Sequence, residues 1–163
     1  MSKTCFVEFN GSGFWALSDS LAVLLGQSVV VAEEMAADRR SATFADVIHQ
    51  LRVSAVVTDL GLLVDAAWRG TRLDLLLHLI EEANRRLAQR GRVTASEVAG
   101  WTALGDDVIE LRRDTVETAP VIELGQAVLH LLRGTLPSAP KGTWWFYGVE
   151  GGPQIIVMRN MKS

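Results

Sequence analysis

The chain has 163 residues, of which 48% are hydrophobic and 21% charged, with a formal net charge of −3. This composition predicts a single domain over residues 1–163 and argues against non-specific nucleic-acid binding, which needs a basic surface. The lone cysteine, Cys5, excludes an intramolecular disulfide, and the chain has neither a signal-peptide pattern nor an apolar run long enough to cross a membrane, so we expect a cytoplasmic protein.

Residues 4–9, "TCFVEF", are rich in β-branched and aromatic types and predict a strand. The stretch that follows places Gly11, Gly13 and Ala16 in a G-x-G-x-x-A frame. In a dinucleotide-binding turn such glycines let the backbone approach a pyrophosphate, and Glu33, about 20 residues further on, would bind a ribose hydroxyl. The alternative is an ordinary bend, after which Phe14 and Trp15 enter the core.

Residues 28–33 distinguish these alternatives. Ser18 or Asp19 can cap a helix that runs from about residue 19 to about residue 38. Val29, Val30 and Val31 instead favour a second strand. A strand would support the nucleotide site, and a continuous helix would remove it.

The middle of the chain predicts two clear helices around an ambiguous segment. Thr43 and Asp46 resemble a capping box that opens a helix through residue 52. Residues 53–68 fit helix or strand equally well. A helix begins at Thr71 and ends before Gly91, with ion pairs expected four residues apart from Glu81 to Arg85 and from Glu82 to Arg86.

The last third predicts two helices and a hairpin. Thr94 and Glu97 form a capping box before a short helix that ends near Leu104. Pro120 suits the first turn of a helix that stops at Gly134. Residues 143–159 then read as two strands about a turn at 150–153. The fold class is α+β, with several helices packed on a small antiparallel sheet formed by the N-terminal strand and the C-terminal hairpin.

The aromatic run "WWFY", residues 144–147, is the most unusual local feature. Trp145 and Tyr147 should face the opposite side from Trp144 and Phe146, and a face left uncovered would anchor a protein partner. We predict Trp145 and Tyr147 as partner-binding anchors. The acidic pair Asp106–Asp107 is predicted as a charged rim that recognises a basic partner.

Outside the G-x-G-x-x-A frame, no residue pattern indicates catalysis, a metal or a cofactor. The three histidines, His49, His78 and His130, have no His or Cys partner at helical spacing, and we expect His78 and His130 to be partly buried structural residues. Cys5 is expected to be buried and inert. No nucleophile elbow or Walker lysine loop is present.

The segments "GSGFWALSDSLAVLL", "RLDLLLHLIEEANRRL" and "TWWFYGVEGGPQIIVMR" together resemble small bacterial immunity proteins found beside polymorphic toxins. The resemblance implies a non-catalytic protein that neutralises a cognate toxin by direct binding, and it carries over no particular functional residue. The alternative function is a small Rossmann-like oxidoreductase or regulator that uses Gly11, Gly13 and Glu33. A homodimer and an adaptor without a ligand remain open.

Overall fold

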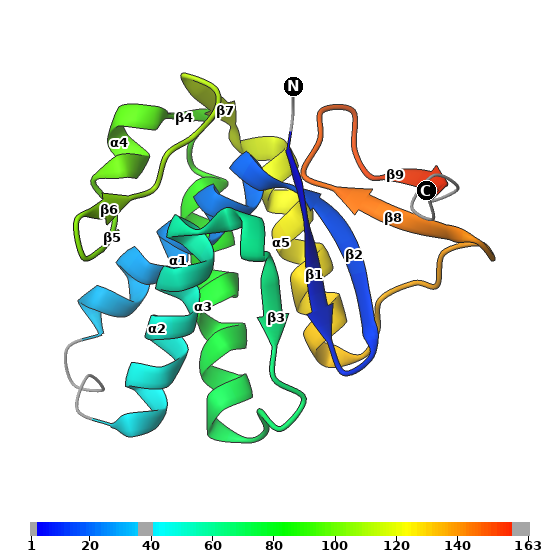
Figure 1. The fold of residues 1–163 in the computed structure, drawn as a ribbon, viewed down its shortest axis with the longest axis horizontal. Coiled ribbons are helices and arrows are strands. Elements are labelled where there is room, and N and C mark those ends of the chain that lie inside the picture. The colour runs from blue at the N-terminus through cyan, green and yellow to red at the C-terminus, as the bar shows by residue number, and fades with distance from the viewer. Residues whose placement is uncertain (1–2, 36–40, 158–163) are drawn as a thin grey trace.

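The structure is a computed structural model that describes residues 3–35 and 41–157. Its helices are α1 (Ser18–Glu34), α2 (Ala42–Val56), α3 (Thr71–Leu87), α4 (Ala95–Ala99) and α5 (Thr118–Arg133). Its strands are β1 (Thr4–Phe9), β2 (Ser12–Leu17), β3 (Leu62–Val64), β4 (Arg92–Thr94), β5 (Ala103–Leu104), β6 (Asp107–Val108), β7 (Thr115–Glu117), β8 (Thr143–Tyr147) and β9 (Gln154–Val157). Figure 1 shows their arrangement.

The first two strands form a hairpin with a two-residue turn at Asn10 and Gly11. Their φ angles are 53° and 82°, and two positive angles in succession are typical of the type I′ turn that suits paired strands. Each residue of β1 faces one residue of β2 in antiparallel register. The predicted bend at Gly11 is confirmed, but the second strand was not predicted, and Gly13 lies inside it.

Helix α1 is the centre of the fold and runs unbroken from Ser18 to Glu34. Residues 28–33 are therefore helical, and the alternative of a strand there is wrong. Helices α2, α3 and α5 pack around α1 (Figure 1), and most of its residues are buried. Burial on all sides outweighs the strand preference of consecutive valines. Leu17 occupies the N-cap position, so neither Ser18 nor Asp19 caps the helix.

The cap of α2 lies two residues before the one predicted. The Ser41 hydroxyl accepts a hydrogen bond from the Phe44 backbone N–H at 3.0 Å. The predicted capping box at Thr43 and Asp46 is therefore wrong, since Thr43 lies inside the helix. The ambiguous residues 53–68 contain the end of α2, a short 3₁₀ helix and β3.

The other helix ends agree with the sequence more closely. The Thr94 hydroxyl accepts the Glu97 N–H at 3.1 Å, which confirms that cap, although α4 stops at Ala99. Pro120 lies in the first turn of α5, and Gly134 ends that helix with a left-handed φ of 73°. α3 ends at Leu87, before Gly91 can act as its cap.

The main sheet has five strands in the order β3-β1-β2-β8-β9. The β1–β2 and β8–β9 pairings are antiparallel, whereas β1–β3 and β2–β8 are parallel. The α+β class is confirmed, and the sheet contains the predicted N-terminal strand and C-terminal hairpin. It is mixed rather than purely antiparallel, and the hairpin joins through β2 instead of β1.

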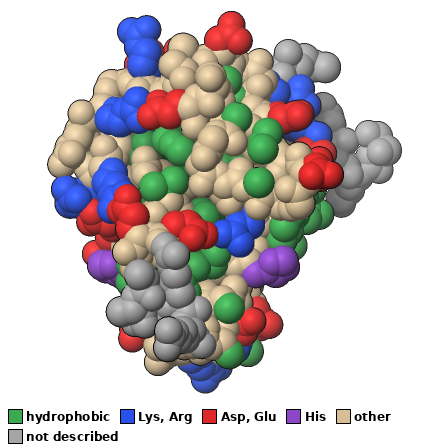
Figure 2. Space-filling model, turned by 90° about the vertical axis from the view of Figure 1, so that its left-hand side faces the viewer, with side chains coloured by type: hydrophobic (Ala, Val, Ile, Leu, Met, Phe, Trp, Pro, Cys, Tyr) green, Lys and Arg blue, Asp and Glu red, His purple; other side chains and the backbone are tan. Residues whose placement is uncertain are grey.

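The helices cover one face of this sheet, and among residues 3–35 and 41–157 no helix covers the other (Figure 1). Cys5, Val7 and Phe14 point from the strands into the core beneath the helices and are almost completely buried. On the helical side of the molecule, basic and acidic side chains alternate across the surface with hydrophobic ones between them (Figure 2). That side therefore carries no large surface of one charge.

Candidate functional site

The face of the sheet that points away from the helices carries a cluster of aromatic side chains. Cys5 and Val7 point inward from β1, so Phe6 between them points outward. The Phe6 ring makes an edge-to-face contact with Trp15 of β2, with ring centroids 5.1 Å apart and an angle of 67°. It makes a second with Trp144 of β8, at 5.3 Å and 79°. We call Phe6, Trp15 and Trp144 the outer aromatic cluster.

The strand register adds apolar neighbours to the outer aromatic cluster, because residues that face each other across paired strands share a face of the sheet. The pairs concerned are Trp15 with Phe146, Trp144 with Ile156, and Glu8 with Leu63. Trp144 and Leu63 remain 39% and 53% exposed. Among the described strand residues of the five-stranded sheet, Glu8 is the only charged one.

Gly13 allows the rings of the outer aromatic cluster to meet. A Cβ atom at this position would lie 2.7–2.8 Å from the Phe6 ring and 2.4 Å from the Val7 carbonyl oxygen. A side chain here would therefore displace the Phe6 ring from its place over the strand. The glycine is explained by close approach of an aromatic ring and a neighbouring backbone.

The indole N–H of Trp15 is buried and has no hydrogen-bond acceptor among the described residues. Buried indole donors usually find a partner. Its edge-to-face contact with Phe6 is therefore an apolar contact that no polar bond reinforces. The outer aromatic cluster is held together by ring packing.

The predicted anchors Trp145 and Tyr147 lie on the inner face of the sheet, on the opposite side from the outer aromatic cluster. Tyr147 is only 8% exposed and packs edge-to-face on Phe14, with ring centroids 4.9 Å apart. Burial raises the pKa of its hydroxyl. Trp145 is half-buried and donates its indole N–H to the Pro137 carbonyl at 3.0 Å. The prediction that the two faces differ is correct, but the exposed tryptophan is Trp144.

The predicted acidic rim lies far from these aromatic residues. Asp106 and Asp107 are exposed at the turn between β5 and β6, beside α4. Figure 1 places β5 and β6 at the opposite end of the molecule from β8 and β9. The structure therefore does not bring Asp106 and Asp107 to one surface with Trp145 and Tyr147, and they cannot form a rim around them.

The residues of the alternative nucleotide site are also separated. Gly11 is at the tip of the β1–β2 hairpin and Gly13 is within β2, so no helix begins directly after them. Glu33 lies near the other end of α1 and pairs with Arg52 of α2 at 2.5 Å. Because residues 28–33 are helical, this site lacks the second strand on which it depended.

A shallow cleft adjoins the outer aromatic cluster. It has a volume of about 250 Å³ and lies between the start of β2 and the loop that precedes β8. Its walls include Gly13, Leu136, Pro137, Trp144 and Trp145. The cleft joins the outer aromatic cluster to the neighbouring loop, and Ser12, Ser138 and Thr143 also line it.

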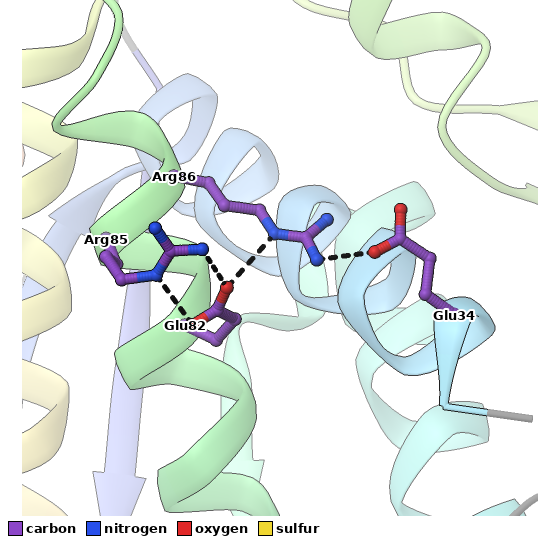
Figure 3. Close-up of polar contacts among 4 residues, drawn as sticks. All are labelled: Glu34, Glu82, Arg85 and Arg86. Carbon is purple, nitrogen blue, oxygen red and sulfur yellow. Dashed lines mark hydrogen bonds and ion pairs between the residues drawn. The ribbon is translucent and has the colours of Figure 1, made fainter. Parts of the chain in front are cut away.

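Glu82, the carboxylate whose pKa is most strongly lowered, belongs to an ion-pair network between α1 and α3 (Figure 3). Glu82 binds the guanidinium groups of both Arg85 and Arg86, and Arg86 also binds Glu34 at the end of α1. The predicted Glu82–Arg86 pair is confirmed at 3.3 Å. The predicted Glu81–Arg85 pair is not formed, because Glu81 reaches Arg133 of α5.

Hydrogen bonds from the arginines explain the titration of this network. The Arg85 bond, aided by Arg86, lowers the pKa of Glu82 from 4.5 to about 2. The Arg86 bond lowers the pKa of Glu34. Both carboxylates are therefore held in the charged form, in which Glu82 pairs within α3 and Glu34 joins α1 to α3. This is what a structural network requires, whereas a proton-transfer group needs a pKa near the working pH.

Asp19, which the sequence suggests as a helix cap, is instead a buried carboxylate that binds a distant loop. Its oxygens accept backbone N–H bonds from Arg112 and Arg113 at 3.0–3.2 Å. Its side chain is 6% exposed, and the Arg113 guanidinium lies 3.7 Å away. Asp19 thus ties the segment before β7 to the first turn of α1.

The remaining candidate groups have structural or solvent-exposed positions. Burial raises the pKa of the Cys5 thiol to about 11, so the thiolate nucleophile is scarce at neutral pH. His49, His78 and His130 are exposed, so the expectation of partly buried histidines is wrong. Within residues 3–35 and 41–157, no three His, Cys, Asp or Glu side chains gather as a metal site would require.

Among the described residues, no helix has both the length and the apolar character needed to cross a bilayer. No family model, curated protein or solved structure matches the chain.

Proposed function

We propose that this chain is a non-catalytic, cytoplasmic immunity protein of a bacterium, which neutralises a cognate toxin by binding it through the outer aromatic cluster. The observation that carries the proposal is the exposure of Trp144 beside Phe6, on a sheet face that no helix of the described part of the chain covers. Large apolar side chains exposed together mark interaction surfaces, and tryptophan is the side chain most enriched among residues that dominate binding energy.

The chemistry of this face defines the partner. A complementary surface needs an apolar pocket for the Trp144 ring and a cation opposite Glu8. An acidic residue at the edge of an apolar patch steers a basic partner and fixes its orientation. The net charge of −3 agrees with a basic toxin domain. Binding needs a standard interface of roughly 800 Å² on each protein, which would extend beyond the cluster to the adjoining cleft.

The positions of the shifted ionisable groups support a binding role. Among the described residues, every group with a resolved pKa shift lies in an ion pair or is buried by its neighbours. Catalytic groups with shifted pKa values typically line a cleft that substrate can enter. A stoichiometric inhibitor requires a rigid surface and no such group.

The test measures toxin binding, and protection of toxin-expressing cells, by variants that each change one surface of the protein. We expect the Trp144→Ala variant to bind the purified toxin domain encoded beside this protein at least about 30-fold more weakly, as for a central anchor. The same variant should protect toxin-expressing cells less well than the wild type. Isothermal titration calorimetry and growth rescue are the two measurements, with circular dichroism to verify folding.

The matched control is the double variant Asp106→Asn and Asp107→Asn, at the opposite end of the molecule. It should bind and protect as the wild type does. Loss of binding in this control, with normal binding by Trp144→Ala, would place the interface at the β5–β6 turn. If the wild-type proteins fail to associate and the toxin still stops growth, the proposed function is wrong.

A further inference from the structure

Glu8 is a carboxylate on the outer face of the sheet that has no partner in the described part of the chain. It is exposed, and it makes no ion pair or hydrogen bond within residues 3–35 and 41–157. Lys3, the basic residue nearest to it in the sequence, pairs with Asp59 instead. Water therefore solvates the Glu8 carboxylate in the free protein.

The strand register places Glu8 between the two exposed apolar side chains of this face. Leu63 of β3 lies opposite Glu8 on one side, and Gly13 of β2 lies opposite it on the other. The parallel register of β2 with β8, extended by two residues, puts Gly13 beside Trp144, and both residues line the same cleft. The row across the sheet is therefore Leu63, Glu8, Gly13 and Trp144.

The Phe6 ring occupies the space that Gly13 leaves open in this row. A Cβ atom at Gly13 would lie 2.7–2.8 Å from the ring, and the ring centroid lies 5.3 Å from that of Trp144. The carboxylate is thus followed across the sheet by a phenyl ring and then by an indole. Two strand spacings separate Glu8 from Trp144, which is about 10 Å between their Cα atoms. A single group of a partner can contact both side chains.

A partner that binds this face has to pair with Glu8. Leu63 and Trp144 are 53% and 39% exposed, and a protein that covers both also covers Glu8 between them. A carboxylate that is removed from water without a partner opposes binding strongly. An apolar side chain over Glu8 would therefore be unfavourable, and the partner must supply a cation at this position.

Arginine suits this position better than lysine does. Its guanidinium group is planar and weakly hydrated, so it can stack on an aromatic ring while its edge donates N–H groups to a carboxylate. The lysine ammonium group is compact and strongly hydrated, and it loses more hydration when it is placed against rings. Phe6 and Trp144 supply the rings, and Glu8 supplies the carboxylate.

We propose that the outer face is an arginine-binding site, in which a guanidinium group of the partner stacks on the rings of Phe6 and Trp144 and donates hydrogen bonds to Glu8. The inference rests on the proposed function for the kind of partner, a toxin domain. It identifies the cation that faces Glu8 as an arginine side chain.

The first experiment titrates the full chain with N-acetyl-arginine amide, and separately with N-acetyl-lysine amide, at constant ionic strength. The indole N–H signal of Trp144 is identified in two-dimensional NMR spectra by its loss in Trp144→Phe. We expect this signal to shift in a saturable way, with a Kd on the order of 100 mM for the arginine derivative, as for one exposed cation–π contact joined to one ion pair. The lysine derivative should bind at least about threefold more weakly.

Two variants test the carboxylate. Glu8→Gln should weaken binding of the arginine derivative about threefold, the effect of losing an exposed ion pair. The control is the double variant Asp106→Asn and Asp107→Asn, which removes two exposed carboxylates away from the sheet and should bind as the wild type does. The dispersion of the remaining NMR signals verifies folding. The proposal is overturned by equal affinity for arginine and lysine, by an unchanged Trp144 signal, or by equal losses in Glu8→Gln and the control.

A second experiment separates this inference from the proposed function. Each arginine of the purified toxin domain is replaced by lysine, and binding to the wild type and to Glu8→Gln is measured by calorimetry. One replacement should weaken binding to the wild type at least about tenfold and have little further effect on Glu8→Gln, because both changes remove the same contact.

The possible outcomes of these experiments are distinct. A toxin domain that binds through Trp144 but has no such arginine would contradict this inference and leave the proposed function intact. An arginine derivative that binds at Glu8 and Trp144, in a protein that neither binds a toxin nor protects cells, would support the arginine site and contradict the proposed function.

Discussion

Gly13 shows how one residue determines whether a surface can exist. Its missing side chain lets the Phe6 ring lie over β2 and reach Trp144. The glycine that first suggested a phosphate-binding turn is thus required by an aromatic contact. The chemistry of the G-x-G-x-x-A frame depends on the element that contains it, and here the second glycine is part of a strand.

We predict that Gly13→Ala lowers the free energy of unfolding by about 1–3 kcal/mol, the usual cost of forcing an extra carbon into a packed site. The new Cβ would lie 2.4 Å from the Val7 carbonyl oxygen. The control is Gly91→Ala, where no heavy atom lies within 4 Å of the added carbon. Urea titration measures both variants, and equal stability of the two would contradict the close approach at Gly13.

The burial of some side chains could be predicted from the sequence, whereas contacts between side chains on different strands depended on which strands pair. The burial of Phe14 and Cys5 followed from their place in apolar runs. The partnership of Phe6 with Trp15 did not, because it requires β2, which was not predicted. The available signal was Asn10–Gly11 between alternating apolar residues, a strong indication of a type I′ hairpin. That turn would have placed Phe6 opposite Trp15 and given the first two members of the outer aromatic cluster.

At the scale of elements, helix α1 takes the place of the second strand that the predicted nucleotide site requires. Three successive valines favour a strand locally, yet the segment is helical because it is enclosed by α2, α3 and α5. Each fully buried valine or leucine contributes about 1.5–3 kcal/mol of transfer free energy, which exceeds the difference in helix propensity. The packing of α1 against α2, α3 and α5 therefore determines that the three valines are helical.

The ion-pair network on α3 predicts a pH-dependent stability. The pKa of Glu82 is lowered in the folded protein from 4.5 to about 2, so its pairing stabilises the fold above pH 4.5. This contribution is lost as the pH falls from about 4.5 toward about 2, because protonation then favours the unfolded chain. We expect Glu82→Gln to lower the Tm at pH 7 and to differ progressively less from the wild type toward pH 3.

Thermal unfolding monitored by circular dichroism at several pH values measures this effect. The control is Glu123→Gln on α5, a helical glutamate that has no ion pair among the described residues. High salt should reduce the Glu82→Gln difference, since the pairs are near the surface. A Tm difference that stays constant between pH 7 and pH 3 would mean that the Glu82 pairs do not contribute.

Helix limits were predicted where a local signal decides them. Such signals act through bonds or dihedral angles within one turn. The structure confirms the predicted positions of Thr94, Pro120 and Gly134 at their helix ends. Thr43 failed because Ser41, two residues earlier, offers the same hydroxyl to the Phe44 N–H. Ser41 and Thr43, two residues apart, can each serve as the N-cap of α2, and the sequence alone does not show which one does.

At the scale of the whole molecule, one continuous core joins the sheet to the helices. It includes Phe14 of β2, Leu24 of α1, Phe44 of α2, Leu79 of α3 and Tyr147 of β8. The α+β class could be predicted because it depends on the types of element. The strand order could not, since the parallel pairing of β2 with β8 joins segments far apart in the chain and leaves no local pattern.

We expect the protein to unfold in one cooperative transition. Trp15, Trp144 and Trp145 lie in the sheet, and Trp68 and Trp101 lie outside its strands. In a variant with Trp68→Phe and Trp101→Phe, fluorescence therefore reports on the sheet, whereas far-UV circular dichroism reports mainly on the helices. The two signals should give superimposable urea curves, because elements that share a core unfold together. An earlier fluorescence transition would contradict this and would identify the sheet as a separately unfolding unit.

The parallel pairing of β2 with β8 also has a consequence for biosynthesis. The Ser20 hydroxyl donates to the Gly148 carbonyl at 2.6 Å, beside the point where the two strands pair. While the ribosome is still producing the helical region, the β1–β2 hairpin has one edge without its neighbour. The sheet is completed only after β8 has left the ribosome. The edge of β2 is therefore unpaired during most of translation, and it is the edge of the nascent chain that a chaperone would protect.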